Sequence, residues 1–540
     1  MRVGDYNWWP SAHTTEGVRL AQTGRTNVRF SNTTAAKRES KSCRAAKELE
    51  EGLTGYGWPT RGSTGERVSL LLQHQAIRRG REWSEGEVCN IRKWTHQLYP
   101  ERVFTRGERK EILALHYETG CGGLPSPPQG STDQGVGGTT ERTVPTGECL
   151  LRLVSQLSIR DILEHDVVRD STPGCPYVGF GPGIGTNADL LTSFGALIER
   201  AVAQRLWLLF HTPVEEIRKM SAQERVRHGL CDPVRLFVKN EPHKIHKLRT
   251  GRLRLICSVS ILDFCVEKFL SRAQNNHEIA NWFNIPSMSG MGLDDEGIRV
   301  IYHIVASALQ REDLETSDVI GWDQSVQANE LRNEAEMRIM LRLPYGVERP
   351  EEFSWANAVR SRAELGMRAL RVTSDGYFWE ALDDGIVLSG SANTAASNCR
   401  IRWTISQLER ETVGFGICMG DDSVTSARAT PTEFYASIGH PLKDVKRLKS
   451  VPYKDAVFDF CSHVFSMRDG RVVAEPLNWE KSLYRLLCHA PSQELLDQFK
   501  YVMRHSSSLE RCLQVLSSVG WTTENLIPTE NVSEESESKV

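Results

Sequence analysis

Apolar residues recur at helical spacing in several stretches of the chain. Between residues 262 and 273, the apolar side chains repeat every three or four positions, so one face of a helix there should meet a core. Similar patterns predict further helices at 150–163, 295–310, 352–365, 431–438, 480–488, 493–505 and 509–519, a helix that begins at residue 69, and a short helical piece at 112–117. Much of the chain should therefore be helical.

Shorter apolar runs predict strands. Residues 457–465 alternate well enough for one strand. Residues 415–419 read as a buried strand and 423–425 as the returning one, so Gly420, Asp421 and Asp422 should form a tight hairpin turn. Further upstream, Arg252 and Arg254 alternate with leucines, which on a strand would place both arginines on one face. A solvated edge strand would show the same alternation.

Polar, weakly periodic segments separate these elements. Residues 1–60 are polar and interrupted by aromatic clusters, and either a solvated extension or an arm docked through its tryptophans fits them. We expect partial order there. Residues 120–147 are rich in Gly, Pro, Ser and Thr and predict a long loop. The acidic residues after Leu526 predict a disordered tail.

Composition limits the class of protein. With 540 residues, the chain should divide into about three or four domain-sized parts. The net charge of −3 means that a nucleic-acid partner would have to be held by local basic stretches. Thirteen scattered cysteines without a Cys-x-x-Cys pair argue against a zinc module or a disulfide framework and favour a reduced, cytosolic compartment. We see no secretory signal and no apolar run of membrane-spanning length.

Acidic residues form a second centre. Asp318 falls in a short strand, and Asp323 falls just after Gly321, where that strand should end. Asp323 could equally cap the helix that follows, up to residue 341. Residues 388–400 are small and flexible and lead into a helix on which Thr394 and Asn398 share one face. That loop would let a substrate approach the backbone closely, or it could be a helix start with an Asn cap.

In this order, these stretches resemble viral RNA-dependent RNA polymerases of positive-strand RNA viruses, most of all the sobemovirus, polerovirus and barnavirus group. The resemblance covers roughly residues 170–465 and leaves the first 150 or so without a named motif. The matching stretches are 171–177 (motif G), 239–254 (motif F), 289–293 (a stretch shared within the group), 318–326 (motif A), 389–398 (motif B), 419–424 (motif C), 443–446 (motif D) and 460–463 (motif E).

The resemblance implies an α+β, right-hand fold of fingers, palm and thumb, with an antiparallel palm sheet packed on helices and a mostly helical thumb. The expected parts are a partly ordered extension (1–68), fingers (69–290), palm (291–344), a fingers insert (345–385), palm again (386–465), thumb (466–526) and a disordered acidic tail (527–540).

The chemistry expected of such a site is in-line attack of a 3′-hydroxyl on an α-phosphate, supported by Mg²⁺, or Mn²⁺ in its place, on carboxylate oxygens. Asp318 and Asp421 are predicted as bridging metal ligands and Asp422 as a peripheral one. A lysine, Lys446 or Lys443, would protonate the leaving pyrophosphate. Binding of the incoming nucleotide is assigned to Lys239, Arg252 and Arg254 for the triphosphate, to Asp323, Asn398 and Ser389 for the ribose, to Thr394 as a brace, and to Gly390 in the small-residue loop.

Two other functions remain open on the sequence. A reverse transcriptase shares the paired acids, but the polar Asp323 and Asn398 favour ribonucleotides. A catalytically silent RNA-binding scaffold would not need three acids facing phosphates. The expected partners are template and product RNA, nucleoside triphosphates and, from the resembled group, a genome-linked protein primer. The expected location is the host cytoplasm at replication complexes, with membrane contact only through partners.

Overall fold

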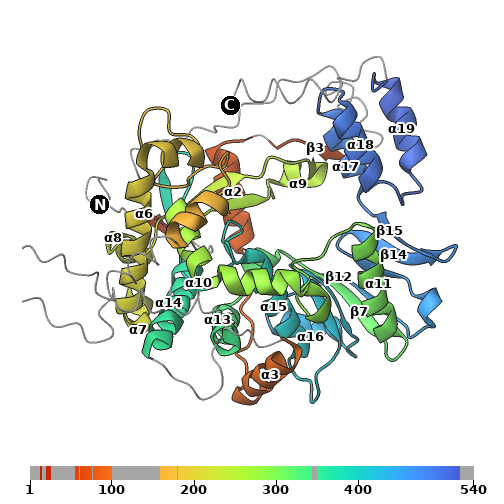
Figure 1. Ribbon diagram of the computed structural model, residues 1–540, viewed down its shortest axis with the longest axis horizontal. Coiled ribbons are helices and arrows are strands. Elements are labelled where there is room, and N and C mark those ends of the chain that lie inside the picture. The colour runs from red at the N-terminus through yellow and green to blue at the C-terminus, as the bar shows by residue number, and fades with distance from the viewer. Residues whose placement is uncertain are drawn as a thin grey trace, which may run out of the picture.

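The computed structural model describes residues 13–14, 20–25, 55–59, 61–75, 77–99, 158–178, 180–342 and 350–522. Over these residues, the protein combines helices with mainly antiparallel sheets, as the sequence predicted. In Figure 1, a helix-rich part holding α6 and α14 lies at one end of the molecule, and the β7–β12 sheet and the C-terminal helices lie at the other. The predicted helix at 112–117, the loop at 120–147 and the acidic tail lie outside the described residues.

A six-stranded sheet joins distant segments of the helix-rich part. Its strand order is β1 (His13–Thr14), β2 (Leu20–Arg25), β9 (Tyr377–Ala381), β8 (Arg371–Val372), β4 (Val234–Val238) and β6 (Leu255–Ser258). The segments read from the sequence as a polar extension and an irregular insert thus both contribute strands. β2 lacks apolar alternation and β8 spans only two residues, so neither strand shows a periodic pattern in the sequence.

Long helices pack beside this sheet. Leu262, Val266 and Leu270 on α10 are buried in one apolar cluster with residues of α6 and α14, which confirms the helical face predicted between 262 and 273. The helices of this part are α2 (Ser63–Gln75), α6 (Asn187–His211), α7 (Val214–Lys219), α8 (Ala222–Arg227), α9 (Ile245–Thr250), α10 (Ile261–Ala280), α13 (Ala328–Arg342) and α14 (Pro350–Met367). α3 (Glu85–Leu98) packs on α13 and belongs to the apolar cluster of the other part.

A four-stranded antiparallel sheet forms the centre of the other part, with helices on both faces. Adjacent residues of a strand point to opposite faces. Ile417 accordingly packs with α11, and Cys418 packs with α15 and α16. In sheet order, the strands are β10 (Gly416–Met419), β11 (Asp422–Ser426), β7 (Leu314–Val319) and β12 (Leu442–Leu448); the helices are α11 (Asp295–Leu309), α12 (Trp322–Ser325), α15 (Thr394–Gln407) and α16 (Pro431–Ser437).

The prediction of one strand at 457–465 is wrong, because the chain turns back at Cys461 and Ser462. Both residues have positive φ, 49° and 59°, as a type I′ hairpin turn requires. Neither is a glycine or an asparagine, the residues that favour positive φ, so this turn was not predicted. A three-stranded sheet of β13 (Phe458–Phe460), β14 (His463–Arg468) and β15 (Arg471–Pro476) results, followed by helices α17 (Trp479–Leu487), α18 (Gln493–Val502) and α19 (Leu509–Ser518).

An N-terminal segment connects the two parts of the molecule. β3 (Tyr56–Gly57) pairs with β5 (His243–Lys244) of the helix-rich part. On its other side, Tyr56 is buried among the C-terminal helices, and the Trp58 indole lies 2.9 Å from the sulfur of Cys488. Figure 1 shows β3 next to α17. This aromatic cluster therefore docks on the body, as one of the two sequence interpretations proposed.

Two further observations concern the described residues as a whole. Their cysteines are all free thiols. No helix among them is long and apolar enough to cross a bilayer.

Candidate active site

The three predicted metal ligands meet at one end of the four-stranded sheet. β11 and β7 are antiparallel, with Ser423 opposite Ser317. One residue further along the same register, Asp422 comes opposite Asp318. Asp421 precedes Asp422 in the two-residue turn between β10 and β11, so strand pairing brings together acids that are a hundred residues apart in sequence.

The turn that carries Asp421 is fixed by its backbone and by α15. Gly420 has φ +64°, a conformation that suits the first central residue of a type II′ hairpin. Its N–H donates to the Cys399 sulfur at 3.3 Å, and the Asp421 carbonyl accepts from Arg402 Nε at 3.1 Å. The fully buried Arg402 also donates to the Tyr435 hydroxyl at 2.8 Å. Sequence reasoning missed Arg402, although a charge amid the apolar residues of this helix was a signal.

The carboxylates destabilise one another's charged forms. Burial, followed by the negative charges of Asp421 and Asp318, raises the pKa of Asp422 to about 7. Burial and Asp318 also raise the pKa of Asp421. The ammonium group of Lys443 lies 2.9 Å from Asp318 Oδ2, and the pKa of Lys443 is raised because it donates to Asp318 and Asp444. A protein cation therefore partly neutralises this acidic cluster.

The same residues fit a divalent cation in their chemistry. Among the described residues, no three acidic, His or Cys side chains converge into a ready metal cluster. Asp318, Asp421 and Asp422 nevertheless supply oxygen ligands on adjacent strands, their charges repel, and Asp318 already binds the cation of Lys443. Oxygen donors with excess negative charge are what Mg²⁺ and Mn²⁺ favour.

Asp323 lies beside this cluster and is not a helix cap. Gly321, with φ +62°, is the N-cap of the four-residue helix α12, and Asp323 lies within its first turn. That alternative reading of Asp323 is therefore wrong. Burial, followed by the charge of Asp421, raises the pKa of Asp323 to about 6. The structure thus places Asp323 within electrostatic reach of the turn.

Asn398 is the second residue predicted to read the sugar. It sits on α15, is 5% exposed, and its Oδ1 accepts no hydrogen bond from the described residues. An orphaned buried amide oxygen is costly unless a ligand supplies a donor. The Thr394 hydroxyl donates to the carbonyls of Leu388 and Ser391, at 2.7 and 2.9 Å, and so braces the loop rather than Asn398.

Ser389 and Gly390 contact β6 in this structure. The Ser389 hydroxyl accepts from the Cys257 N–H at 3.0 Å. A Cβ on Gly390 would lie 2.3 Å from the Cys257 carbonyl oxygen, so only glycine allows the loop to approach the strand this closely. Their contact with a substrate stays a prediction.

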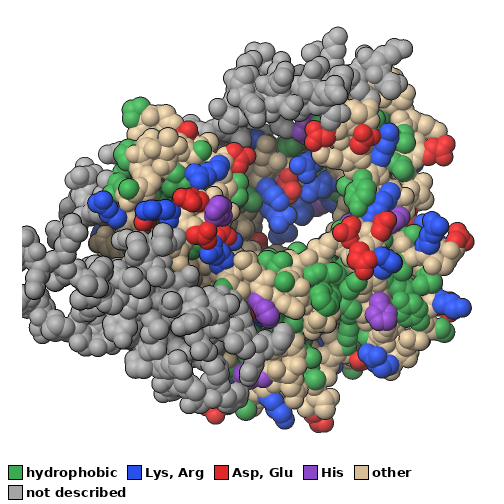
Figure 2. Space-filling view, viewed as in Figure 1, with side chains coloured by type: hydrophobic (Ala, Val, Ile, Leu, Met, Phe, Trp, Pro, Cys, Tyr) green, Lys and Arg blue, Asp and Glu red, His purple; other side chains and the backbone are tan. Residues whose placement is uncertain are grey.

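The basic residues predicted to hold the triphosphate lie at the ends of β4 and β6, with Lys239 directly after β4. β6 begins at Leu255, so Arg252 and Arg254 lie before the strand, not on it, but both are exposed while Leu253 is buried, which keeps the predicted alternation. The pKa values of Asp323 and Asp421 are raised overall, and the positive charge of Arg254 opposes that rise, so Arg254 lies within electrostatic reach of both acids. Figure 2 shows Lys and Arg side chains gathered beside a hollow near the middle of the face.

Glu241 ties this basic group to the C-terminal helices. Its carboxylate lies 3.3 Å from Lys239 Nζ, 3.7 Å from Arg254 and 3.4 Å from Lys481 Nζ of α17. Although burial acts to raise the pKa of Glu241, the charges of Lys481, Lys239 and Arg254 lower it overall. Sequence reasoning singled out the cations but not the acid that holds them.

The two lysines proposed as proton donors lie in different places. β12 carries both, and its lack of apolar alternation hid it from the sequence analysis. Lys443 contacts Asp318, whereas Lys446 contacts Asp459 of β13. The structure therefore brings Lys443 to the acidic cluster, and a catalytic role for Lys446 stays a prediction.

A buried serine, histidine and glutamate lie beneath the site. His440 Nδ1 is 2.9 Å from the Ser325 hydroxyl, and its Nε2 is 2.7 Å from Glu330. The residue types are those of a hydrolytic triad. His440 is 0% exposed and packs against the Trp322 ring, which leaves no access for a substrate. The three residues therefore connect α12, α13 and the start of β12.

Comparison with known proteins identifies the family. Residues 178–304 match a family described as viral RNA-directed RNA-polymerase. The chain is 34% identical over 371 residues to the RNA-directed RNA polymerase of mushroom bacilliform virus, an alignment that covers 66% of this chain and 84% of that protein. The chain belongs to the viral RNA-directed RNA polymerases. The resemblance seen in the sequence is confirmed.

Other relatives are longer proteins of plant viruses. A replicase polyprotein of Southern cowpea mosaic virus is 32% identical over 508 residues, which is 92% of this chain and 46% of that protein. A protein of potato leafroll virus is 27% identical over 475 residues, 83% of this chain and 38% of its own length. This chain thus spans less than half of these two relatives.

Proposed function

We propose that this chain replicates a positive-strand RNA virus genome by joining ribonucleoside triphosphates on an RNA template through two-metal nucleotidyl transfer. The observation that carries this proposal is the meeting of Asp318, Asp421 and Asp422 across one strand pairing, with Arg254 within electrostatic reach of Asp421. RNA binding alone gives no reason to gather repelling acids next to a phosphate-binding cation. The gathered acids therefore favour a polymerase over a silent scaffold.

In this proposal, Asp318 and Asp421 would be the main ligands that hold the divalent cations, and Asp422 would be a peripheral one. When bound, the cations lower the pKa of the attacking 3′-hydroxyl and stabilise charge on the leaving oxygen. Arg254, Arg252 and Lys239 hold the triphosphate through charge-assisted hydrogen bonds. Lys443, whose Nζ lies 2.9 Å from Asp318, would give a proton to the departing pyrophosphate, and Lys446 is the alternative donor.

The proposed anatomy is a right hand. The six-stranded sheet and its helices form the fingers, the four-stranded sheet forms the palm, and α17 to α19 form the thumb. The bridge made by β3 between β5 and the C-terminal helices supports a closed hand. Template and product RNA are the proposed partners, with a genome-linked protein as a proposed primer and the host cytoplasm as the proposed location.

A nucleotide-incorporation assay tests the proposed mechanism. Asp421→Asn and Asp318→Ala should each abolish magnesium-dependent incorporation of ribonucleotides into a primed RNA template and leave the melting temperature nearly unchanged, because each removes a ligand charge. Asp469→Asn is the matched control. Asp469 is an exposed acid in a turn with φ +50°, which asparagine tolerates. Normal incorporation by either metal-ligand variant would refute the proposed ligands.

A further inference from the structure

The small-residue loop before α15 is anchored by one face of α10. Glu267, Ser271 and Asn275 follow one another at intervals of four residues, so their side chains project from the same side of the helix. Ser271 Oγ and Asn275 Nδ2 both donate to Asn393 Oδ1, at 2.6 and 2.8 Å. Asn393 is the N-cap of α15 but makes no side-chain capping bond. Its side chain instead fixes the start of α15 against α10.

Glu267 binds the loop itself, at Ser391 and Ala392. One of its oxygens, Oε2, accepts from the Ser391 hydroxyl at 2.8 Å and from the backbone N–H of Ala392 at 2.7 Å. Glu267 is 4% exposed, so these hydrogen bonds form with little competition from water. A single carboxylate oxygen thereby holds both a side chain and the backbone of the loop.

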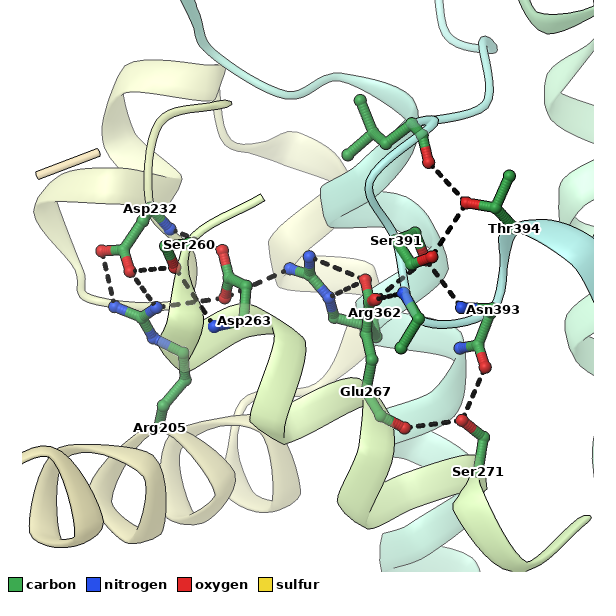
Figure 3. A network of polar contacts seen from close by, with 12 residues as sticks. Arg205, Asp232, Ser260, Asp263, Glu267, Ser271, Arg362, Ser391, Asn393 and Thr394 are labelled. Atoms are coloured by element: carbon green, nitrogen blue, oxygen red, sulfur yellow. Dashed lines mark hydrogen bonds and ion pairs between the residues drawn. The ribbon is translucent and has the colours of Figure 1, made fainter. Parts of the chain in front are cut away.

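The other oxygen of Glu267 is held by a buried row of charges. Arg362 of α14 lies 3.0 Å from Glu267 Oε1 and 3.4 Å from Asp263. Asp263 in turn lies 3.0 Å from Arg205 of α6, which also binds Asp232. Figure 3 shows this row running from α6 to the loop. Three helices thus fix the position of the carboxylate that binds the loop.

Close apolar packing does not hold the loop on the side where it is hydrogen-bonded to α10. A cavity of about 100 Å³ adjoins it, lined by Glu267, Arg362, Ser391 and Asn393 among others. A cavity contributes no dispersion contacts to the residues that line it. The hydrogen bonds to α10 therefore have a large share in setting where the loop lies.

We propose that Glu267 is a positioning residue for sugar selection: by holding Ser391 and Ala392 it sets the start of α15 and so places the Asn398 amide at the ribose 2′-hydroxyl. This inference rests on the proposed reading of the ribose by Asn398. Asn398 follows the N-cap Asn393 by five residues on the same helix, so a shift of the loop moves its amide. Discrimination between two sugars that differ by one hydroxyl depends on such placement.

The test compares Glu267→Asp and Ser391→Ala. The aspartate keeps the charge for Arg362 but withdraws the carboxylate from the loop by one methylene group, and the alanine removes one donor without touching the charge row. Each should lower the ratio of kcat/KM for a ribonucleotide to that for its 2′-deoxy form by about tenfold. In an Asn398→Ala background, Glu267→Asp should change the ratio by less than about twofold, because both act on one hydroxyl.

Glu364→Asp is the matched control. Glu364 is a buried glutamate of α14 held by Arg218 and Arg332, and none of its contacts is with the loop. The Glu364→Asp variant should lower the melting temperature about as much as Glu267→Asp and leave the ribonucleotide-to-deoxyribonucleotide ratio of kcat/KM unchanged. An equal loss of the ratio in both variants would show a merely structural role and overturn the proposal.

Two other results distinguish the positioning role of Glu267 from the sugar-reading role of Asn398 on which it rests. If Asn398→Ala lowers the ratio but Glu267→Asp and Ser391→Ala do not, the positioning role is wrong and the sugar-reading role of Asn398 stands. If Asn398→Ala leaves the ratio at the wild-type value, both roles are wrong, and ribonucleotide incorporation by the wild-type chain still measures the polymerase activity itself.

Discussion

In the proposed function, the polar side chains of Asp323 and Asn398 would select the sugar of the incoming nucleotide. Asp323 supplies acceptors, and Asn398 holds an amide oxygen that no described residue satisfies. A ribose hydroxyl can be both donor and acceptor to such a pair. A deoxyribonucleotide would leave these groups unpaired, and an unpaired buried polar group costs about 1–3 kcal/mol.

The first prediction follows from that cost. Asp323→Ala or Asn398→Ala should lower ribonucleotide incorporation more than deoxyribonucleotide incorporation, so that the ratio of their kcat/KM values falls by roughly one to two orders of magnitude. The two losses should not add in the double variant, since both residues serve one hydroxyl. Asn276→Ala, an exposed change on α10, is the control. An unchanged ratio in both single variants would contradict the assignment.

Arg252 and Arg254 carry a different prediction. Arg254→Ala and Arg252→Ala should raise the KM for nucleoside triphosphates several-fold while template affinity and its salt dependence change less, because their proposed partner is the triphosphate. Arg299→Ala, an exposed arginine on α11 that pairs with Glu296, should change neither quantity. A collapse of template affinity at constant KM would mean that the arginines contact RNA instead.

The hairpin of β10 and β11 shows what a secondary-structure element adds to its residues. Its turn fixes the direction of Asp421 through the positive φ of Gly420 and through the hydrogen bonds from Arg402 and to Cys399. The sequence predicted this element correctly, since apolar runs flank a Gly-Asp-Asp turn. The sequence did not predict β12, whose polar residues show no alternation, or the turn at Cys461 and Ser462, which has no glycine or asparagine at its two positive-φ positions.

Substitution of Gly420 in the hairpin turn should affect both the stability of the protein and its kcat, and a second glycine allows the two effects to be distinguished. Nothing lies within 4 Å of a Cβ on Gly420, so Gly420→Ala should cost only the left-handed backbone strain, about 1–2 kcal/mol of unfolding free energy, and Gly420→Asn less. Gly470→Ala, at φ +75° in the β14–β15 turn and equally open, should cost a similar amount. Only Gly420→Ala should also lower kcat, because only that turn carries Asp421. An equal kcat for both alanine variants would show that the turn's conformation does not matter to the reaction.

Across the whole molecule, contacts between distant segments close the structure around the basic group. Tyr56 and Trp58 join β5 to the C-terminal helices, and Glu241 joins Lys239 to Lys481. The net charge of −3 gave no sign of this arrangement, because the cations are concentrated by folding and not by composition. Retention of RNA should depend on keeping these parts together.

Tyr56→Ala tests this closure. Loss of a buried aromatic ring costs about 3–5 kcal/mol at its site, so the variant should melt at a lower temperature and release RNA faster, while the KM for nucleotides changes little. Tyr501→Ala, a 53% exposed ring on α18, should leave both properties near the wild-type values. The rate at which each variant releases a labelled primer–template measures this difference between Tyr56→Ala and Tyr501→Ala. Equal dissociation rates in both variants would show that the bridge has no part in holding RNA.

The sequence by itself determined the hairpin, the helical faces and the identity of the acids and cations, because these depend on local periodicity and on residue chemistry. Only the tertiary structure decided that Asp422 opposes Asp318, that Lys443 and not Lys446 contacts the acids, and that Arg402 and Glu267 hold the turn and the loop. These contacts join residues on different elements, up to 125 positions apart in the chain. Such pairings are fixed by strand register and helix packing, which a single chain's local pattern does not encode.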